Sequence, residues 1–269
     1  MPGMVPPRMR SWGVLMGDHL PAGVRITEIV RETPTVSTLW FEHRFSFNPG
    51  QFVMVWVPGV DEVPMALSSP SSITVQKAGD ATSALLSMKK GANLGIRGPF
   101  GNGFALRDGT LAIAGGVGAA PLLPLAMTGV VSTFILGART ADELLFKKGL
   151  EQITELKIMT DDGSAGNKGF AVQGMDDLSL EQYSQVCVCG PEKMMAAVLL
   201  RLREEGLEER GKFSLHRYMK CGCGVCGSCC IDPSGFRVCR EGPVFSGELL
   251  LESEFGHYSR DGSGRKRPC

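Results

Sequence analysis

Six of the nine cysteines in the chain lie within one short stretch, MKCGCGVCGSCCIDPSGFRVC, at residues 219–239. Clustered thiols form disulfides in oxidising compartments, whereas in a reducing compartment they are more often metal ligands. The N-terminal sequence MPGMVPPRMRSWGVLMGDHLP lacks the uninterrupted apolar segment of a secretory signal peptide, so we expect the chain to remain in the cytoplasm. The six cysteines are therefore expected to bind metal.

Four of these cysteines have the spacing of a two-iron cluster. Cys221, Cys226 and Cys229 follow the pattern C-x4-C-x2-C, and Cys239 lies ten residues further on. In plant-type [2Fe–2S] sites, one loop supplies three thiolates with this spacing and a more distant thiolate completes the site. We therefore predict that these four thiolates hold a [2Fe–2S] cluster.

Structural zinc is the main alternative for this stretch. Cys223, Cys226, Cys229 and Cys230 can be grouped as four tetrahedral ligands. Zinc ribbons, however, usually place two C-x2-C pairs on separate turns about fifteen or more residues apart, whereas the best-spaced thiols here share one loop. This spacing favours iron and sulfide, and it leaves Cys223 and Cys230 as spare, packed thiols.

The elements that must position these cysteines change character along the chain. From 23 to 108, short apolar or alternating runs are separated by Gly, Pro and Asn, which predicts an antiparallel barrel or sandwich. From 109 to 212, strand-like runs alternate with helical patterns, which predicts βαβ units and a parallel sheet. The helical patterns are AAPLLPLAMTG, TADELLFKKGLEQI and PEKMMAAVLLRLREEG. The cysteine module occupies 213–251, with an N-terminal tail at 1–22 and a charged, Gly/Ser-rich tail at 252–269 that we expect to be weakly ordered.

The composition excludes some classes of partner. Lys+Arg and Asp+Glu each total 28, so the formal net charge is zero and no global field attracts nucleic acid or an anionic membrane. The longest apolar run, LAIAGGVGAAPLLPLAMTGVV, is interrupted by glycines and prolines and is expected to be buried core and not a membrane span. A small molecule or another protein is the expected partner.

Two short motifs of the predicted α/β domain could contact a nucleotide. In GGVGAAP, Gly115, Gly116 and Gly118 follow a buried strand and open a helix, where unsatisfied N–H groups and the helix dipole favour phosphate. In VCVCGPEKMM, Cys189 ends a strand at the carboxyl edge, where open α/β sheets bind ligands. The alternatives are tight strand-to-helix packing for the glycines and a buried, inert thiol for Cys189.

Taken together, these segments resemble the ferredoxin-reductase superfamily, in which a flavin-binding barrel precedes a nucleotide-binding domain. The order FNPGQFVMVW, PMALSS, GDAT, RGPFGNGF, AGGVGAAPLLPLA, LGART and CGPEKMM follows that family from about residue 23 to 200. The segment YMKCGCGVCGSCCIDPSGFRVCREGPVF is similar to the C-terminal [2Fe–2S] module of one branch, the electron-transfer subunits of NAD-linked dihydroorotate dehydrogenase. The resemblance implies an antiparallel flavin-binding β-barrel, a doubly wound parallel-sheet NAD-binding domain and a small C-terminal [2Fe–2S] module.

The resemblance also assigns residues of the barrel to FAD. They are Met65, Ala66, Leu67 and Ser68 in one segment and Gly79, Ala81 and Thr82 in another. In the first segment the family motif is Arg-x-x-Ser, so Met65 stands where the family has an arginine that would meet the flavin pyrophosphate. In the second, Thr82 and backbone N–H groups would meet the pyrophosphate, and Ala81 replaces a glycine. The alternative for each segment is an ordinary turn.

In the nucleotide domain, the resemblance assigns Gly116 and Gly118 to the dinucleotide phosphates and Cys189 to the catalytic neighbourhood of the nicotinamide. Asp161 and Asp162 lie where an adenosine ribose could sit. Carboxylates accept hydrogen bonds from a 2′-hydroxyl and repel a 2′-phosphate, which favours NAD over NADP. The alternative for the acidic pair is a solvated loop.

These parts together predict an electron converter. Hydride transfer moves two electrons at once, an iron–sulfur cluster passes one at a time, and flavin can do either. The resemblance implies the partner, a catalytic dihydroorotate dehydrogenase subunit carrying FMN, in a heterotetramer with two of each subunit. Electrons would pass from it through the cluster and FAD to NAD⁺ in pyrimidine biosynthesis. The partner is expected to dock through exposed apolar surface around Cys221–Cys230 and Gly242–Phe245.

Two other functions remain open from the sequence. One is the flavin subunit of a sulfur-reducing hydrogenase or of a ferredoxin:NADP oxidoreductase. The other is a non-enzymatic protein with structural zinc, in which the glycine loops serve packing only. Visible absorption separates the two classes, since flavin and iron–sulfur clusters absorb visible light and zinc–thiolate does not.

Overall fold

The structure, a computed structural model, describes residues 20–269. The predicted N-terminal tail at 1–22, and the sequence on which the signal-peptide argument rests, lie almost entirely outside this range. Within residues 20–269, no helix is long and apolar enough to cross a membrane.

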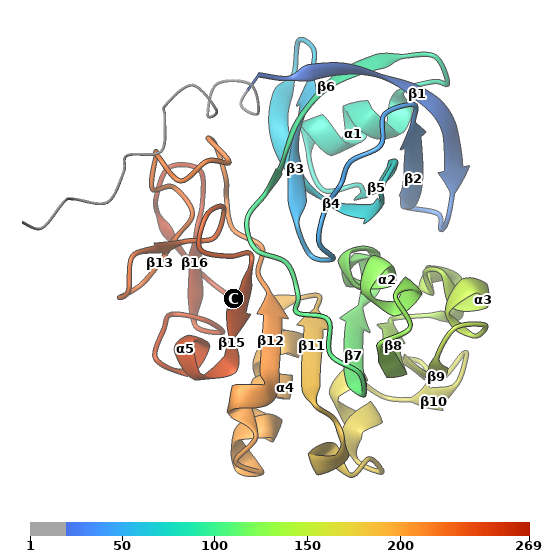
Figure 1. Ribbon diagram of the computed structural model, residues 1–269, viewed down its shortest axis with the longest axis vertical. Coiled ribbons are helices and arrows are strands. Elements are labelled where there is room, and N and C mark those ends of the chain that lie inside the picture. The colour runs from blue at the N-terminus through green and yellow to red at the C-terminus, as the bar shows by residue number, and fades with distance from the viewer. Residues whose placement is uncertain (1–19) are drawn as a thin grey trace, which may run out of the picture.

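The first part of the chain forms a closed six-stranded antiparallel barrel, as predicted (Figure 1). Its elements are β1 (Ala22–Arg31), β2 (Val36–Phe41), β3 (Phe52–Val57), β4 (Asp61–Ser69), β5 (Ser72–Gln76), α1 (Asp80–Ser87) and β6 (Asn93–Phe100). The strand order is β1-β2-β5-β4-β3-β6. Because side chains alternate across a strand, positions such as Leu39, Val55 and Ile73 fill the barrel interior, and the intervening positions face outward.

The second part is a doubly wound sheet of seven strands. Its elements are β7 (Thr110–Gly115), α2 (Ala119–Met127), β8 (Val131–Ala138), α3 (Lys147–Leu150), β9 (Glu155–Thr160), β10 (Asn167–Lys168), β11 (Gln185–Cys189), α4 (Glu192–Glu204), β12 (Gly211–Ser214) and β15 (Val244–Ser246). The order is β10-β9-β8-β7-β11-β12-β15, parallel except for β15. Leu111 and Ile113 share a core cluster with residues of α4, whereas Ala112 and Ala114 share one with α2, so both faces are covered.

The winding of this sheet fixes where a ligand can bind. The chain proceeds from β7 through β8 and β9 to one edge, and from β11 through β12 to the other. The carboxyl ends of the neighbouring strands β7 and β11 therefore form the topological switch point, which is where open α/β sheets bind ligands. The apolar run predicted to be core supplies β7 and α2 at this point.

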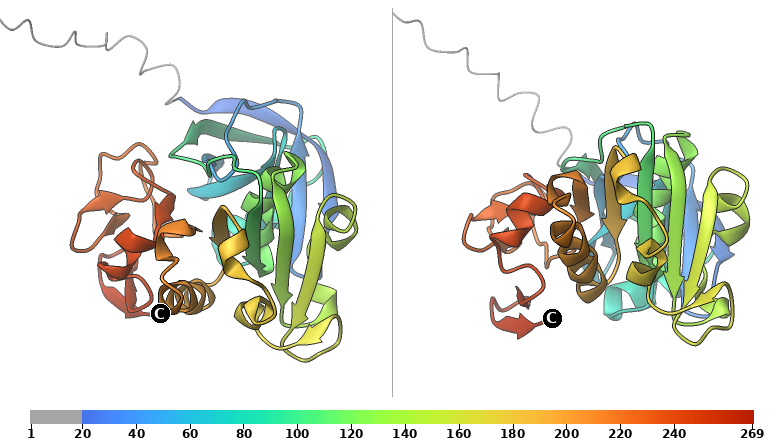
Figure 2. Two further views of the ribbon diagram at one scale, coloured as in Figure 1. Left: turned by 60° about the horizontal axis from the view of Figure 1, so that its bottom comes forward. Right: turned by 90° about the horizontal axis from the view of Figure 1, so that it is seen from below.

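The cysteine-rich segment lies beside both larger parts, at the β12–β15 edge of the sheet and away from β9 and β10 (Figures 1 and 2). Its elements are β13 (Cys230–Ile231), β14 (Phe236–Arg237), α5 (Gly247–Leu251), β16 (Tyr258–Arg260) and β17 (Lys266–Pro268). Strand β15 joins the cysteine-rich segment to the sheet by pairing with β12. At the end of the barrel, the Asn102 N–H donates a hydrogen bond of 2.6 Å to Gly242 O in the same segment. The module is thus held against both domains.

Two expected features differ in the structure. The pattern TADELLFKKGLEQI forms a 3₁₀ turn (Ala141–Glu143) and the short helix α3 instead of one helix, because Phe146 between them adopts a positive φ of 56°. The tail at 252–269 is not irregular, since it contains the β16–β17 hairpin. Tyr258 and Arg260 of this hairpin each donate to Asp232 Oδ2 at 2.6 Å, a contact across more than twenty residues that composition cannot reveal.

A third difference concerns the segment Gly242–Phe245, which we expected to be exposed. Val244 and Phe245 enter strand β15, and the Phe245 side chain is only 5% exposed. Pairing with β12 buries this segment in the edge of the sheet, so it contributes little to a docking surface.

Candidate iron–sulfur and nucleotide sites

The four predicted cluster ligands are brought into one neighbourhood. The Cys221 thiol interacts with the side chains of Cys223 and Cys226, and the Cys229 thiol interacts with that of Cys239 and lies within electrostatic reach of Cys221. Among the described residues, no group of three or more His, Cys, Asp or Glu side chains is arranged to hold one metal ion. A [2Fe–2S] cluster would be held by these four cysteine thiolates together.

Backbone N–H groups of the loop turn toward these sulfurs. Val225 N and Cys226 N lie 3.3 and 3.5 Å from Cys221 Sγ, and Gly224 N lies 3.2 Å from Cys239 Sγ. Gly224 has a φ of +80°, a conformation that favours glycine. Such donors stabilise negative charge on sulfur, both in a free thiolate and in a bound cluster.

The same contacts shift the acidity of the thiols. Burial raises the pKa of Cys221, but the N–H donors outweigh it and lower this pKa to about 6. The hydrogen bond from the Cys239 thiol lowers the pKa of Cys229 to about 7, and it raises the pKa of Cys239. Since the thiolate is the form that binds metal, Cys221 and Cys229 are prepared as ligands near neutral pH.

This predicts a distinctive alkylation profile for the metal-free protein. Because iodoacetamide reacts with the thiolate, the rate at Cys221 should rise with pH to a midpoint near pH 6. In the urea-unfolded chain the same cysteine should show the ordinary midpoint of about 8.5. Cys187, whose pKa burial raises, should stay unmodified in the folded protein. Peptide mass spectrometry measures each site, and equal midpoints for Cys221 in both states would contradict the loop geometry.

The ligand loop packs directly on the outer face of the barrel. A Cβ at Gly222 would lie 2.6 Å from Met54 Cγ and 3.6 Å from the Phe100 ring, so only glycine fits there. Met54 belongs to β3 and Phe100 ends β6. The cluster loop is therefore seated on the barrel that is predicted to hold the flavin.

Arg97 of β6 places a positive charge where the cluster loop meets the barrel. Glu62 holds its guanidinium with two hydrogen bonds of 2.6 Å, and this pairing raises the pKa of Arg97. Cys221 and Cys223 lie within its electrostatic reach. A cation beside a cluster favours the reduced, more negative state. No local sequence pattern marks Arg97 as part of this site.

At the switch point, the structure brings together the two predicted nucleotide motifs. Gly118 lies so close to Cys189 O that a Cβ would collide with it, and the same Cβ would be 2.7 Å from Gly190 N. Gly116, in contrast, has a φ of +53° and open space where a Cβ would be. Gly118 is thus required for packing of β7 against β11, and Gly116 leaves room for a phosphate to approach the backbone.

The thiol of Cys189 is buried at this edge. The residue is 2% exposed, and burial raises the pKa of its thiol to about 12. It shares a core cluster with Ala119 and Leu122 of α2. At neutral pH this thiol is protonated and uncharged, so it is suited to a van der Waals contact and not to attack on a substrate.

The first predicted flavin segment is divided between two faces of β4. Leu67 fills the barrel interior and Met65 packs against the same cluster, whereas Ser68 lies at an irregularity in the pairing of β4 with β5. Ser68 Oγ accepts a hydrogen bond from Thr74 and shares another with Ser72, both of 3.0 Å. The hydroxyl is part of a buried polar cluster on the side of the barrel where α2 and the Gly116–Gly118 turn pack.

The second predicted flavin segment begins helix α1. Thr82 Oγ1 accepts from Ala78 N at 2.8 Å and from Gly79 N at 2.9 Å, so its hydroxyl caps the turn. Ala81 is a buried residue of the helix itself, and Gly79 has open space where a Cβ would be. A phosphate can therefore approach the backbone at Gly79, next to the free N–H groups that begin a helix, while Thr82 shapes the turn.

The acidic pair after β9 adopts a turn. Asp162 Oδ1 accepts from Ser164 N at 2.9 Å and from Ser164 Oγ at 2.6 Å, and the side-chain bond lowers the pKa of Asp162. Asp161 lies within electrostatic reach of Arg139. These contacts fit the solvated-loop alternative and keep Asp162 ionised, so its role toward a ribose stays a prediction.

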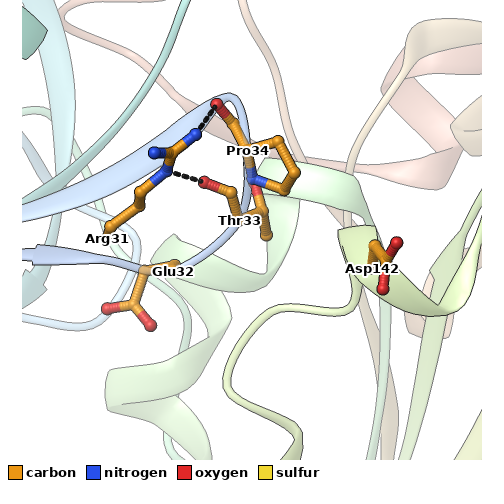
Figure 3. Close-up of a pocket in the computed structure, with 5 residues that line it drawn as sticks. All are labelled: Arg31, Glu32, Thr33, Pro34 and Asp142. Atoms are coloured by element: carbon orange, nitrogen blue, oxygen red, sulfur yellow. Dashed lines mark hydrogen bonds between the residues drawn. The ribbon is translucent and has the colours of Figure 1, made fainter.

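A pocket that the sequence did not suggest lies between the barrel and the sheet domain (Figure 3). It has a volume of about 320 Å³ and is lined by Arg31, Glu32, Thr33, Pro34 and Asp142. Arg31 donates to the backbone oxygens of Thr33 and Pro34 at 3.4 and 3.2 Å, so its guanidinium closes its own turn. The pocket is lined by charged groups of both signs and lies away from the ligand cysteines.

The cysteine module matches a known protein-family model, and most of the chain aligns with named relatives. The family model described as the iron-sulfur cluster binding domain of dihydroorotate dehydrogenase B matches residues 216–251, which include all four predicted ligands. A protein of Methanocella arvoryzae named probable dihydroorotate dehydrogenase B (NAD(+)), electron transfer subunit, is 50% identical over 254 residues, covering 92% of this chain and 98% of that protein. A protein of the same name from Methanocaldococcus jannaschii is 45% identical over 253 residues, covering 91% and 98%.

Solved structures show the same architecture. A chain from the structure of an NADH-dependent reduced ferredoxin-NADP oxidoreductase superposes with a TM-score of 0.77 and 30% identity, covering 87% of this chain and 90% of that one. The cytochrome b5 reductase domain of Ulva prolifera nitrate reductase superposes with a TM-score of 0.60 at 17% identity, covering 71% and 96%. The second likeness concerns the fold alone.

Proposed function

The chain belongs to the family of dihydroorotate dehydrogenase B (NAD(+)) electron transfer subunits, and we propose that it carries electrons from dihydroorotate oxidation on a partner subunit to NAD⁺. The route runs through a [2Fe–2S] cluster and FAD, and the pathway is pyrimidine biosynthesis. The observation that carries the proposal is that the four cysteine thiols lie together, inside the matched iron–sulfur domain, in a loop that packs on the outer face of the barrel.

The residues take the following roles in this proposal. Cys221, Cys226, Cys229 and Cys239 hold the cluster, and the N–H groups around them stabilise its negative charge. When bound, the cluster and FAD supply one-electron and two-electron chemistry respectively. The chain itself would position the cluster, because close packing at Gly222 fixes the loop on the barrel.

The flavin and nucleotide contacts are proposed on the geometry of the two domains. The FAD residues are Met65, Ala66, Leu67, Ser68, Gly79, Ala81 and Thr82, and the NAD residues are Gly116, Gly118 and Cys189. Open backbone at Gly79 and Gly116 supports phosphate binding at both places. Cys189, neutral and buried, would limit the nicotinamide pocket as an apolar wall.

The partner is proposed to be a catalytic subunit that carries FMN, in a heterotetramer with two copies of each chain. Exposed apolar side chains beside the ligand loop support a docking face there: Val225 is 82% exposed, Tyr218 43% and Phe236 40%. We also propose that the complex works in the cytoplasm, where ligand thiols stay reduced.

The test is electron transfer through the assembled complex. Anaerobic co-expression with the catalytic subunit should give a complex whose mass corresponds to two of each chain and which forms NADH when dihydroorotate and NAD⁺ are added. NADP⁺ should be used far less well. The 30% identity to the ferredoxin-NADP oxidoreductase chain supports a second candidate, reduction by ferredoxin. NADPH formation from reduced ferredoxin, with no response to dihydroorotate, would favour that candidate.

A further inference from the structure

A buried arginine lies four residues before the first cluster ligand, and all five of its N–H donors are used. The side chain of Arg217 is 2% exposed. Nη1 and Nη2 bind the two carboxylate oxygens of Glu192 at 2.6 and 3.1 Å. Nε and Nη2 bind Glu254 Oε1 at 3.4 and 3.3 Å, and Nη1 also donates to His216 O at 2.8 Å. A guanidinium satisfied in this way holds its partners in fixed directions.

Glu254 connects the two ends of the ligand loop. Its Oε1 accepts from Arg217, which precedes Cys221, and its Oε2 accepts from Asp232 N at 2.5 Å, which follows Cys229. Glu254 N in turn donates to Asp232 O at 3.1 Å. One buried carboxylate, 4% exposed, therefore closes the base of the loop that carries three of the four ligands.

Glu192 connects this base to the nucleotide domain. It is the first residue of α4 and follows Cys189, Gly190 and Pro191 at the switch point. Besides binding Arg217, its Oε1 accepts from Gly256 N at 2.9 Å. The ligand loop is thus linked by charge-assisted hydrogen bonds to the strand end where the nicotinamide is expected.

We propose that Glu192, Arg217 and Glu254 form a clamp that sets the position of the cluster loop relative to the flavin and nucleotide sites, so that Arg217 and Glu254 are positioning residues for electron transfer. This proposal rests on the proposed function, because it concerns how the cluster of that route is positioned. Close packing at Gly222 seats the loop on the barrel, and the clamp fixes its other side. Transfer between cofactors depends steeply on distance, so a loosened loop slows transfer even when the cluster stays bound.

The first experiment measures the loop itself in the metal-free protein. In Arg217→Met, amide hydrogen exchange in residues 218–232 should be at least tenfold faster than in the unmodified protein, with the barrel unchanged. Glu254→Gln should also accelerate exchange, but less than Arg217→Met. The glutamine oxygen can still accept one hydrogen bond, whereas its NH2 group is a donor and would face Asp232 N, which is also a donor. Exposed Glu252→Gln is the matched control and should change nothing. Unchanged loop exchange in both Arg217→Met and Glu254→Gln would overturn the clamp.

The second experiment follows the loaded subunit by anaerobic stopped flow with NADH. In Arg217→Met, flavin reduction should stay within twofold, whereas cluster reduction per bound cluster should slow at least tenfold and the cluster's electron-paramagnetic signal should change shape. Arg217→Lys should recover only part of the rate, since an ammonium lacks the fork that binds Glu192. If Arg217→Met does not fold, the same measurements on Glu254→Gln and Arg217→Lys decide whether the clamp positions the loop.

The outcomes separate the clamp from the proposed function. A variant that loses clusters but reduces the remaining ones at the normal rate would show that Arg217 serves cluster retention only, and would overturn positioning. If the unmodified protein contains no reducible cluster, the proposed function fails, and the hydrogen-exchange result still judges the clamp.

Discussion

Replacing Cys226 by serine is expected to abolish electron passage from this chain to its partner while NADH oxidation by two-electron dyes continues. Cys226 is one of the four proposed ligands, so its loss would leave the cluster with three thiolates. Mutation of outer partners of metal sites alone costs about 10–100-fold, and loss of a ligand should cost about 100-fold or more. Dyes that take hydride equivalents from flavin bypass the cluster, so their reduction should stay within about threefold of normal.

Cys230→Ser is the matched control for this variant. Cys230 lies in the same loop, beside the buried ligand Cys229, and is assigned no iron. It should retain its cluster, its visible spectrum and its rate with the partner. Because Cys226 is exposed, the serine variant should keep the stability of the apoprotein within about 0.5 kcal/mol. Equal loss of dye reduction and partner reduction in Cys226→Ser, with flavin still bound, would contradict the order of the route.

Gly118→Ala should destabilise the nucleotide domain by about 3 kcal/mol, at the upper end of overpacking costs. The added methyl would collide with the backbone of Cys189 and lie 2.7 Å from Gly190 N, and neither backbone can move without separating β7 from β11. For a chain of this size the loss corresponds to roughly 6 to 12 °C in Tm. Thermal and urea unfolding measure the stability, and NADH titration measures the accompanying loss of affinity.

Gly116→Ala separates packing from binding at the same turn. Its Cβ meets open space, and only the positive φ of +53° opposes it, at about 1 kcal/mol. We expect a small loss of stability and a clear rise in KM for NADH, because the methyl occupies the space left for phosphate. The assignment of Gly116 to the nucleotide would be wrong if KM were unchanged.

The sequence predicted what is encoded locally. The spacing of Cys221, Cys226 and Cys229 predicted that one loop carries three of the proposed ligands, because only a few residues and flexible glycines separate them, and backbone N–H groups of that loop turn toward the sulfurs. The alternation of strand and helix patterns likewise predicted the sheet, and both faces are covered as expected. The order of barrel, sheet and module was predictable for the same reason, and the structure confirms it.

The rest depends on contacts between distant segments. Arg217 acquires its role from Glu192 and Glu254, which lie 25 and 37 residues away in the chain, and no local pattern marks such a set. The difference between Gly116 and Gly118 arises only when β11 packs beside β7. The burial of Phe245 follows from strand pairing with β12. Sequence periodicity identifies elements, whereas these features depend on how the elements meet.

In the proposed function, this chain joins one-electron and two-electron chemistry through a [2Fe–2S] cluster and FAD. The most direct measurement is the visible spectrum of the protein purified without oxygen, together with its iron, sulfide, zinc and flavin content. We expect about two irons, two sulfides and one FAD per chain. Zinc bound in place of iron, with no flavin, would contradict it and would make the cysteine loop a structural element.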